Sequence, residues 1–114
     1  MNISDYHIIS KIFAGTTLNI IFQHKTNTQD KQVLELKEVA GFIELEDNEA
    51  IMTLQIEEGG FYASSLSTRL SQPEITTFQE AYIFTDEDNI QCSFRACARS
   101  IAFREWTTED KKLS

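Results

Sequence analysis

Three arginines, Arg95, Arg99 and Arg104, form the one basic concentration of this sequence, and their spacing could serve anion binding. A guanidinium group can hold a carboxylate or a phosphate through two parallel hydrogen bonds. Arg95 and Arg99 share the polar face of one predicted strand. Tyr82 and Trp106 would supply stacking surfaces for a planar group. Together these five residues predict a site for an anionic, nucleotide-like small molecule.

These arginines also have a simpler interpretation. In a chain of net charge −8, arginines on a strand ordinarily pair with carboxylates of neighbouring strands, and Glu80 is such a carboxylate. We favour this interpretation over a ligand site. The net charge also argues against direct binding to nucleic acid, because the chain lacks the basic stripe that displaces counterions from phosphates.

Carboxylates are concentrated between Glu35 and Glu58, where eight acidic residues stand against one basic residue, Lys37. A segment of this charge repels phosphate and attracts a basic partner. A second acidic stretch follows Thr85. The residues predicted to contact a basic protein partner are Glu46, Asp47, Glu49, Glu57, Glu58, Asp86, Glu87 and Asp88. The competing explanation is that this charge only keeps the protein soluble.

The sequence contains no catalytic or metal-binding pattern. A nucleophile needs a base such as histidine, and His7 and His24 stand in no catalytic pattern. Two histidines and two cysteines without CxxC or HxxxH spacing are poor zinc ligands. The four glycines form no phosphate-binding loop. We therefore expect a protein that is not an enzyme, with no catalytic residues, no metal site and no cofactor.

Length and composition indicate one domain over residues 1–114 that folds without disulfides or metal. Hydrophobic residues make up 41% of the chain, which excludes intrinsic disorder. Cys92 and Cys97 lie five residues apart on one predicted strand, so they point to opposite faces and stay unbridged. The chain opens on no signal peptide and has no apolar run of about 20 residues. We expect no membrane contact and a cytoplasmic location.

The elements that must position these side chains begin with a predicted helix over residues 5–14, where apolar residues recur at helical spacing. Residues 17–24 alternate between apolar and polar and predict a strand. The polar stretch 25–32 is typical of a loop. A second strand begins near Val33, and Gly41 inside it marks a bulge or a bend.

Alternation resumes in a predicted first hairpin over residues 42–56. Helical spacing favours a short helix over residues 61–70. A second hairpin over residues 75–99 carries two of the arginines, and a change of apolar phase near Ser100 predicts a bulge. The polar tail, residues 107–114, is expected to be frayed.

This order predicts an α+β fold with an N-terminal helix and a curved antiparallel β-sheet of about five strands. Gly41 and the bulge near Ser100 could instead close the sheet into a small, partly closed barrel. The order of helix, three strands, helix and two strands also resembles the general pattern of type III secretion chaperones. That resemblance implies a protein-binding function.

The function we expect is non-enzymatic inhibition of a basic protein partner by the acidic surface. An immunity protein that neutralises a nuclease toxin, or a phage inhibitor of a nucleic-acid-handling defence enzyme, would work in this way. Complementary charge accelerates association and can mask a phosphate-binding groove. Binding of an anionic small molecule and secretion chaperoning are the two alternatives.

Overall fold

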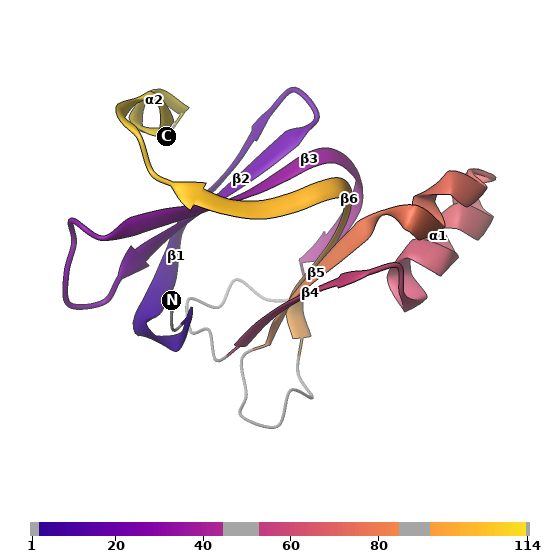
Figure 1. The fold of residues 1–114 in the computed structure, drawn as a ribbon, viewed down its shortest axis with the longest axis horizontal. Helices are drawn as coiled ribbons and strands as arrows, with labels where there is room; N and C mark the ends of the chain where they lie inside the picture. Colours follow the sequence, from indigo (N-terminus) through magenta and orange to yellow (C-terminus); the bar gives the residue numbers. More distant parts are fainter. Residues whose placement is uncertain (1–2, 45–52, 85–91, 114) are drawn as a thin grey trace.

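The computed structural model describes residues 3–44, 53–84 and 92–113. The strands in these ranges are β1 (Tyr6–Ala14), β2 (Thr17–His24), β3 (Lys31–Glu44), β4 (Thr53–Glu58), β5 (Gln79–Phe84) and β6 (Cys92–Glu105). The helices are the 3-10 helices η1 (Ile3–Asp5) and η2 (Pro73–Thr77) and the α-helices α1 (Phe61–Leu70) and α2 (Thr108–Leu113). The strands form one antiparallel sheet in the order β1-β2-β3-β6-β5-β4, with the two longest strands at its centre (Figure 1).

The sheet curves around a hydrophobic core on its concave face. Every strand contributes to this core, because alternate residues of a strand point to the same side. Its buried members are Tyr6, Leu18, Ile20, Phe22, Leu34, Leu36, Ala81, Ile83, Phe94, Ala96, Ala98 and Ile101, and Leu54 of β4 packs against them. η1 lies close to β4, but the edge strands β1 and β4 do not pair in the described ranges. The sheet is therefore open and does not close into a barrel.

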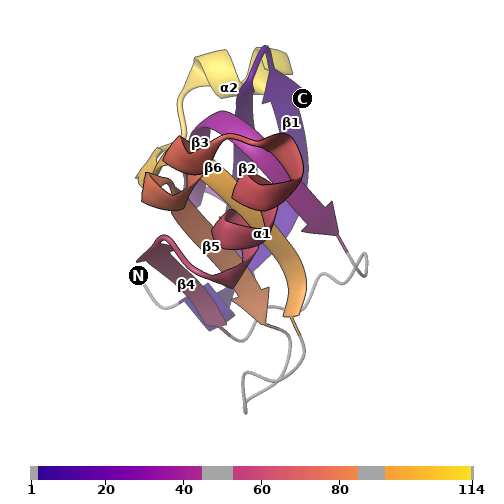
Figure 2. The ribbon, with the colours of Figure 1, turned by 90° about the vertical axis from the view of Figure 1, so that its right-hand side faces the viewer.

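The convex face carries α1, η2 and α2, whereas Ile3 of η1 packs against the concave core. α1 and η2 pack over β5 and β6, and Figure 2 shows α1 in front of these two strands. A second buried cluster lies there around Cys97, and its members from α1 to the start of β5 are Tyr62, Ala63, Leu66, Ile75 and Phe78. α2 lies at the other end of the molecule (Figure 1). The helices thus cover only part of the convex face.

The helix predicted over residues 5–14 is wrong, because this segment forms η1 and strand β1. β1 pairs with β2 through a tight turn in which Gly15 is left-handed, with φ +65°. A register shift between Ile8 and Ser10 marks a β-bulge, so that Ile8 and Phe13 both lie opposite core residues of β2. The bulge spaces apolar residues as a helix would, whereas β-branched isoleucine favours the strand.

The predicted hairpin over residues 42–56 is also wrong. The last residues of β3 pair with β6, and β4 pairs with β5, so two strands separate β3 from β4. Alternation does not identify the neighbour of a strand, and the prediction assumed that consecutive strands pair, which is the commoner arrangement. The sheet consequently has six strands and not about five. The predicted turn over residues 46–49 lies outside the described residues.

Other predicted elements are confirmed. The strand over residues 17–24 and the helix over residues 61–70 have the predicted bounds. β5 and β6 form the second predicted hairpin, although β5 begins only at Gln79, after η2. The irregularity at Gly41 is a register shift between Val39 and Gly41. A bulge at this point lets the long strand β3 bend with the sheet.

The change of phase near Ser100 is present, but the register shift lies in the neighbouring strand. Ala98 and Ile101 both belong to the concave core, so β6 changes phase between them. The extra residue belongs to β3, between the positions paired with Ala98 and Cys97. The pairs of Ile101, Ser100 and Ala98 with β3 keep one register, so β6 has no bulge at the predicted position.

Phe94→Ala tests the assignment of the concave core. Phe94 is 1% exposed within the core that all six strands share, so we expect its truncation to lower the free energy of unfolding by about 3–5 kcal/mol. Phe103→Ala makes the same change on the same strand at a side chain that is 39% exposed, and should cost about 1 kcal/mol. Urea denaturation followed by circular dichroism measures both. Equal losses would show that a different face is buried.

Candidate functional site

A buried glutamate joins α1 to the sheet. Glu80 of β5 is fully buried, and its carboxylate accepts a hydrogen bond from the backbone N–H of Ala63 in the first turn of α1. Gly60, which precedes the helix, makes no side-chain cap. It adopts φ +126°, and a Cβ atom there would lie 2.8 Å from Glu80 Oε2. Glu80 therefore satisfies an N–H at the helix N-terminus, where the helix dipole favours negative charge.

Burial raises the pKa of Glu80, because loss of water disfavours the charged form. The Ala63 N–H and Arg95 oppose this increase, and the carboxylate of Glu57, paired with Glu80 across β4 and β5, adds to it. Glu80 Oε2 has no hydrogen-bond partner within the described structure. Cys97, opposite Glu80 on β6, is a free thiol whose pKa burial raises to about 11. Its reactive thiolate is scarce at neutral pH.

Beyond Glu80 along β5, a shallow pocket of about 250 Å³ opens on the sheet. Gln55 of β4, Tyr82 of β5 and Arg95 of β6 lie side by side across three strands. Glu57 and Phe84 complete the lining. Tyr82 stacks with Phe84 at a distance of 6.3 Å between ring centroids. The pocket thus combines an aromatic floor with one cation and one anion.

Arg95 is the group in this pocket that lacks a polar partner. Its Cζ lies 4.9 Å from the ring centroid of Tyr82. Its Nε is buried without a hydrogen-bond partner, and no ion pair joins Arg95 to an acid in the part of the chain that the structure describes. A buried donor without an acceptor costs free energy. Arg95 is therefore the strongest candidate for contact with a ligand.

Arg99 is already engaged within the chain. It forms an ion pair with Glu38 of the neighbouring strand β3, and its Cζ lies 5.1 Å from the ring centroid of Phe78. Arg99 lies with Arg95 on the convex face, as predicted, but it does not line the pocket. Cross-strand pairing with a carboxylate is thus confirmed for Arg99, with Glu38 in place of Glu80.

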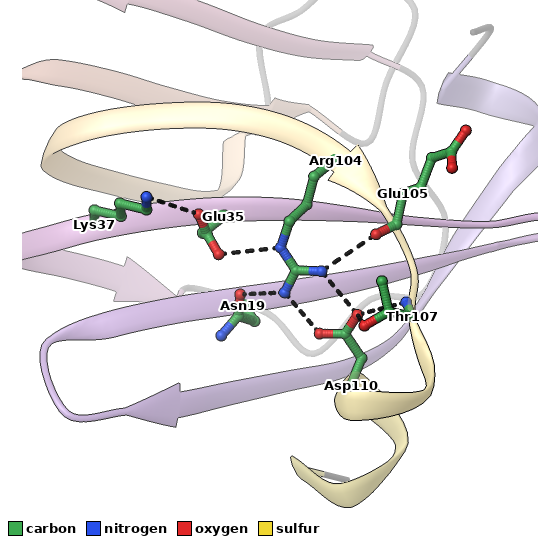
Figure 3. Close-up of polar contacts among 7 residues, drawn as sticks. All are labelled: Asn19, Glu35, Lys37, Arg104, Glu105, Thr107 and Asp110. Atoms are coloured by element: carbon green, nitrogen blue, oxygen red, sulfur yellow. Dashed lines mark hydrogen bonds and ion pairs between the residues drawn. The ribbon is translucent and has the colours of Figure 1, made fainter.

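Arg104 joins the sheet to α2 (Figure 3). Its guanidinium donates to the two carboxylate oxygens of Asp110 at 2.6 and 2.7 Å, and its Nε donates to Glu35 at 3.0 Å. The side-chain oxygen of Asn19 and the backbone carbonyl of Glu105 each accept at 3.2 Å. These contacts occupy all five donors of the guanidinium. Arg104 therefore has no donor left for a ligand.

The tail predicted to be frayed, residues 107–114, instead contains α2. Asp110 is only 2% exposed and accepts a hydrogen bond of 2.8 Å from the backbone N–H of Thr107. Hydrogen bonding to Arg104 lowers the pKa of Asp110 to about 2. A polar tail carries no hydrophobic pattern from which this buried contact could be recognised. The one signal in the sequence is an arginine six residues before an aspartate.

Trp106, the second predicted stacking residue, lies at the same end of the sheet as Arg104. It packs against Lys31, whose Nζ is 4.5 Å from the ring centroid. The structure therefore separates the predicted ligand-binding residues into different sites. Of the five, only Tyr82 and Arg95 meet in one pocket.

Glu57 and Glu58, at the end of the edge strand β4, are exposed. Neither forms an ion pair with another described residue. The remaining residues predicted to contact a basic partner lie outside the described residues; they are Glu46, Asp47, Glu49, Asp86, Glu87 and Asp88. The partner surface thus stays a prediction, with two of its members placed in solvent.

The described histidines and acids are spread over the fold. Within residues 3–44, 53–84 and 92–113, no group of three or more His, Cys, Asp and Glu side chains could hold a metal ion. His24 Nδ1 accepts hydrogen bonds of 3.2 Å from the backbone N–H groups of Thr26 and Asn27, and so stabilises the turn after β2. None of the helices in these ranges has the length and apolar character needed to cross a membrane.

No protein-family model matches this chain, and no curated protein or solved structure shows significant similarity to it. Function must therefore be argued from the chain itself. The two features available are the pocket at Arg95 and the distribution of charge over the surface.

Asp110→Asn tests the anchoring of α2. The pKa of Asp110 is lowered from 3.8 to about 2 on folding, so its ion pair stabilises the fold above about pH 4. This contribution is lost as the pH falls from about 4 towards 2. At pH 7 we expect the variant to lose about 1–2 kcal/mol of unfolding free energy, since Arg104 is partly exposed. By about pH 2.5 the difference from the wild type should have largely disappeared.

Glu105→Gln is the matched control for this measurement. Figure 3 shows the Glu105 carboxylate pointing away from Arg104, so the variant should match the wild type at both pH values. Urea denaturation at each pH gives the free energies. A deficit in Asp110→Asn that stays constant from pH 7 to pH 2.5 would contradict the ion-pair mechanism.

Proposed function

We propose that this protein is a stoichiometric, non-enzymatic inhibitor that places an acidic surface over a basic groove of a partner protein. Two examples of such an inhibitor are an immunity protein that neutralises a nuclease toxin and a phage inhibitor of a nucleic-acid-handling defence enzyme. The single observation that carries the proposal is that four cations of the described chain are paired internally while Glu57 and Glu58, on an edge strand, form no ion pair with a described residue.

Internal ion pairs use four of the cations. The pairs are Lys11 with Glu44, Lys37 with Glu35, Arg99 with Glu38 and Arg104 with Asp110. Each pair cancels its own charge, so the net charge of −8 resides on acids outside these pairs. Glu57 and Glu58 are two of them, and both face solvent. A surface of this kind attracts basic proteins and repels nucleic acid.

Inhibition of this kind requires no chemistry. Complementary charge raises the association rate, and the bound inhibitor prevents phosphates from entering the groove. The free, buried thiol of Cys97 is compatible with the reducing cytoplasm, where such a partner would be met.

The secretion-chaperone hypothesis was based on the predicted order of elements. It depended on an order of elements that begins with an α-helix, whereas the described chain begins with η1 and strand β1. The inhibitor proposal does not depend on that order, because it uses the charge distribution alone.

Neutralising three acids tests the inhibitor proposal. The variant Glu46→Gln, Asp47→Asn, Glu49→Gln should bind its copurifying basic partner with an association rate reduced about tenfold, because electrostatic steering is weakened. Raising the ionic strength from about 50 to 500 mM should slow the wild type similarly, since the Debye length falls from about 14 to 4 Å. Stopped-flow fluorescence measures the rates.

A control variant changes the net charge equally at other places. Glu74→Gln, Glu105→Gln and Glu109→Gln remove three exposed acids, in η2, at the end of β6 and in α2. This variant should associate within about threefold of the wild-type rate, because steering depends on charge near the contact. The proposal is refuted if both triple variants slow association equally, or if the wild-type rate does not respond to salt.

A further inference from the structure

We propose that the pocket on β4, β5 and β6 binds a nucleoside through its base, and that guanine is the base it fits. The pocket is lined by Gln55, Glu57, Tyr82, Phe84 and Arg95. Guanine carries hydrogen-bond acceptors on one edge and donors on another. The lining contains one cation, on β6, and one anion, on β4. This proposal does not depend on the inhibitor proposal.

The floor of the pocket suits a flat ring. Tyr82 is 5% exposed, and the planes of Tyr82 and Phe84 are 20° apart. Arg95 already covers Tyr82, so a planar ligand would lie beside the guanidinium and stack on the more exposed ring of Phe84. Single bases commonly stack on aromatic rings and guanidinium planes. A volume of about 250 Å³ is small compared with pockets for larger ligands and admits one base.

Arg95 supplies the donors of the pocket. Its Nε has no acceptor in the described structure, and its guanidinium forms no ion pair there. A guanidinium can donate two parallel hydrogen bonds to O6 and N7 of guanine. Bound guanine would thus give the guanidinium acceptors that the described residues do not provide.

Glu57 supplies the acceptor on the opposite side. It lies on β4, two strands away from Arg95 on β6 and offset from it by two residues along the strands, so their backbones are about 12 Å apart. A base that forms a hydrogen bond at each of two edges can bridge the two side chains across this distance. The Glu57 carboxylate can accept from N1–H and the 2-amino group of guanine, and the amide of Gln55 lies on the same strand.

The charges of the pocket favour a neutral nucleoside over a phosphate. One arginine and one exposed glutamate face it, and the chain as a whole carries a net charge of −8. A polyphosphate would be repelled by this field, whereas a neutral base would not. The ligand therefore differs from the anion expected of three clustered arginines, because only Arg95 reaches the pocket.

Isothermal titration calorimetry with guanosine, inosine and adenosine tests this proposal. Guanosine should bind with a stoichiometry of one. Inosine lacks only the 2-amino donor and should bind at least about fivefold more weakly, as expected for loss of a base-edge contact. Adenosine presents a donor where guanine presents O6, and should bind more weakly still. Equal affinity for the three nucleosides, or no saturable heat with guanosine, would overturn the proposal.

Two variants assign the contacts to residues. Glu57→Gln changes an exposed side chain, so the fold should survive, and the preference for guanosine over inosine should fall towards onefold. Arg95→Gln should weaken both ligands together, because both carry O6 and N7. Glu74→Gln and Arg69→Gln alter exposed residues outside the pocket lining and should bind guanosine as the wild type does. An unchanged guanosine preference in Glu57→Gln would overturn the assignment.

Discussion

Glu80 holds α1 against the sheet by accepting the Ala63 N–H from beneath the helix, in a space that a side chain at Gly60 would fill. A buried carboxylate is costly, and the helix N-terminus offsets part of this cost with an N–H group and the positive end of its dipole. This contact sets where α1 begins and therefore which part of the convex face is covered. Tyr82 and Arg95 lie immediately beyond it, where the pocket opens.

Charged side chains make different contacts at the two ends of the sheet. At one end, Arg104 gives every donor to Asp110 and neighbouring acceptors, which closes α2 over the sheet. At the other end, carboxylates such as Glu58 remain in solvent, and Arg95 forms no ion pair with a described residue. The inhibitor surface and the nucleoside pocket both follow from this asymmetry, one from the unpaired anions and the other from the unpaired cation.

The sequence predicted the elements whose geometry is determined locally, such as the strand over residues 17–24 and the helix over residues 61–70. It misassigned β1, because a bulge spaced the isoleucines as a helix does. Pairing of β3 with β6 is a long-range choice that alternation does not encode. The meeting of Tyr82 and Arg95 was within reach, since both lie in the second predicted hairpin. The roles of buried acids such as Asp110 depend on tertiary contacts and could not be predicted from the sequence.

An NMR pH titration that follows the Glu80 carboxyl carbon and the Ala63 amide proton tests most directly whether Glu80 holds α1. Burial raises the pKa of Glu80, and the Ala63 N–H donates to its carboxylate. Both signals should therefore titrate with one common midpoint above the ordinary glutamate value of about 4.3. A Glu80 midpoint at or below that value, or an Ala63 amide that does not respond to it, would contradict the capping of α1 by a buried carboxylate.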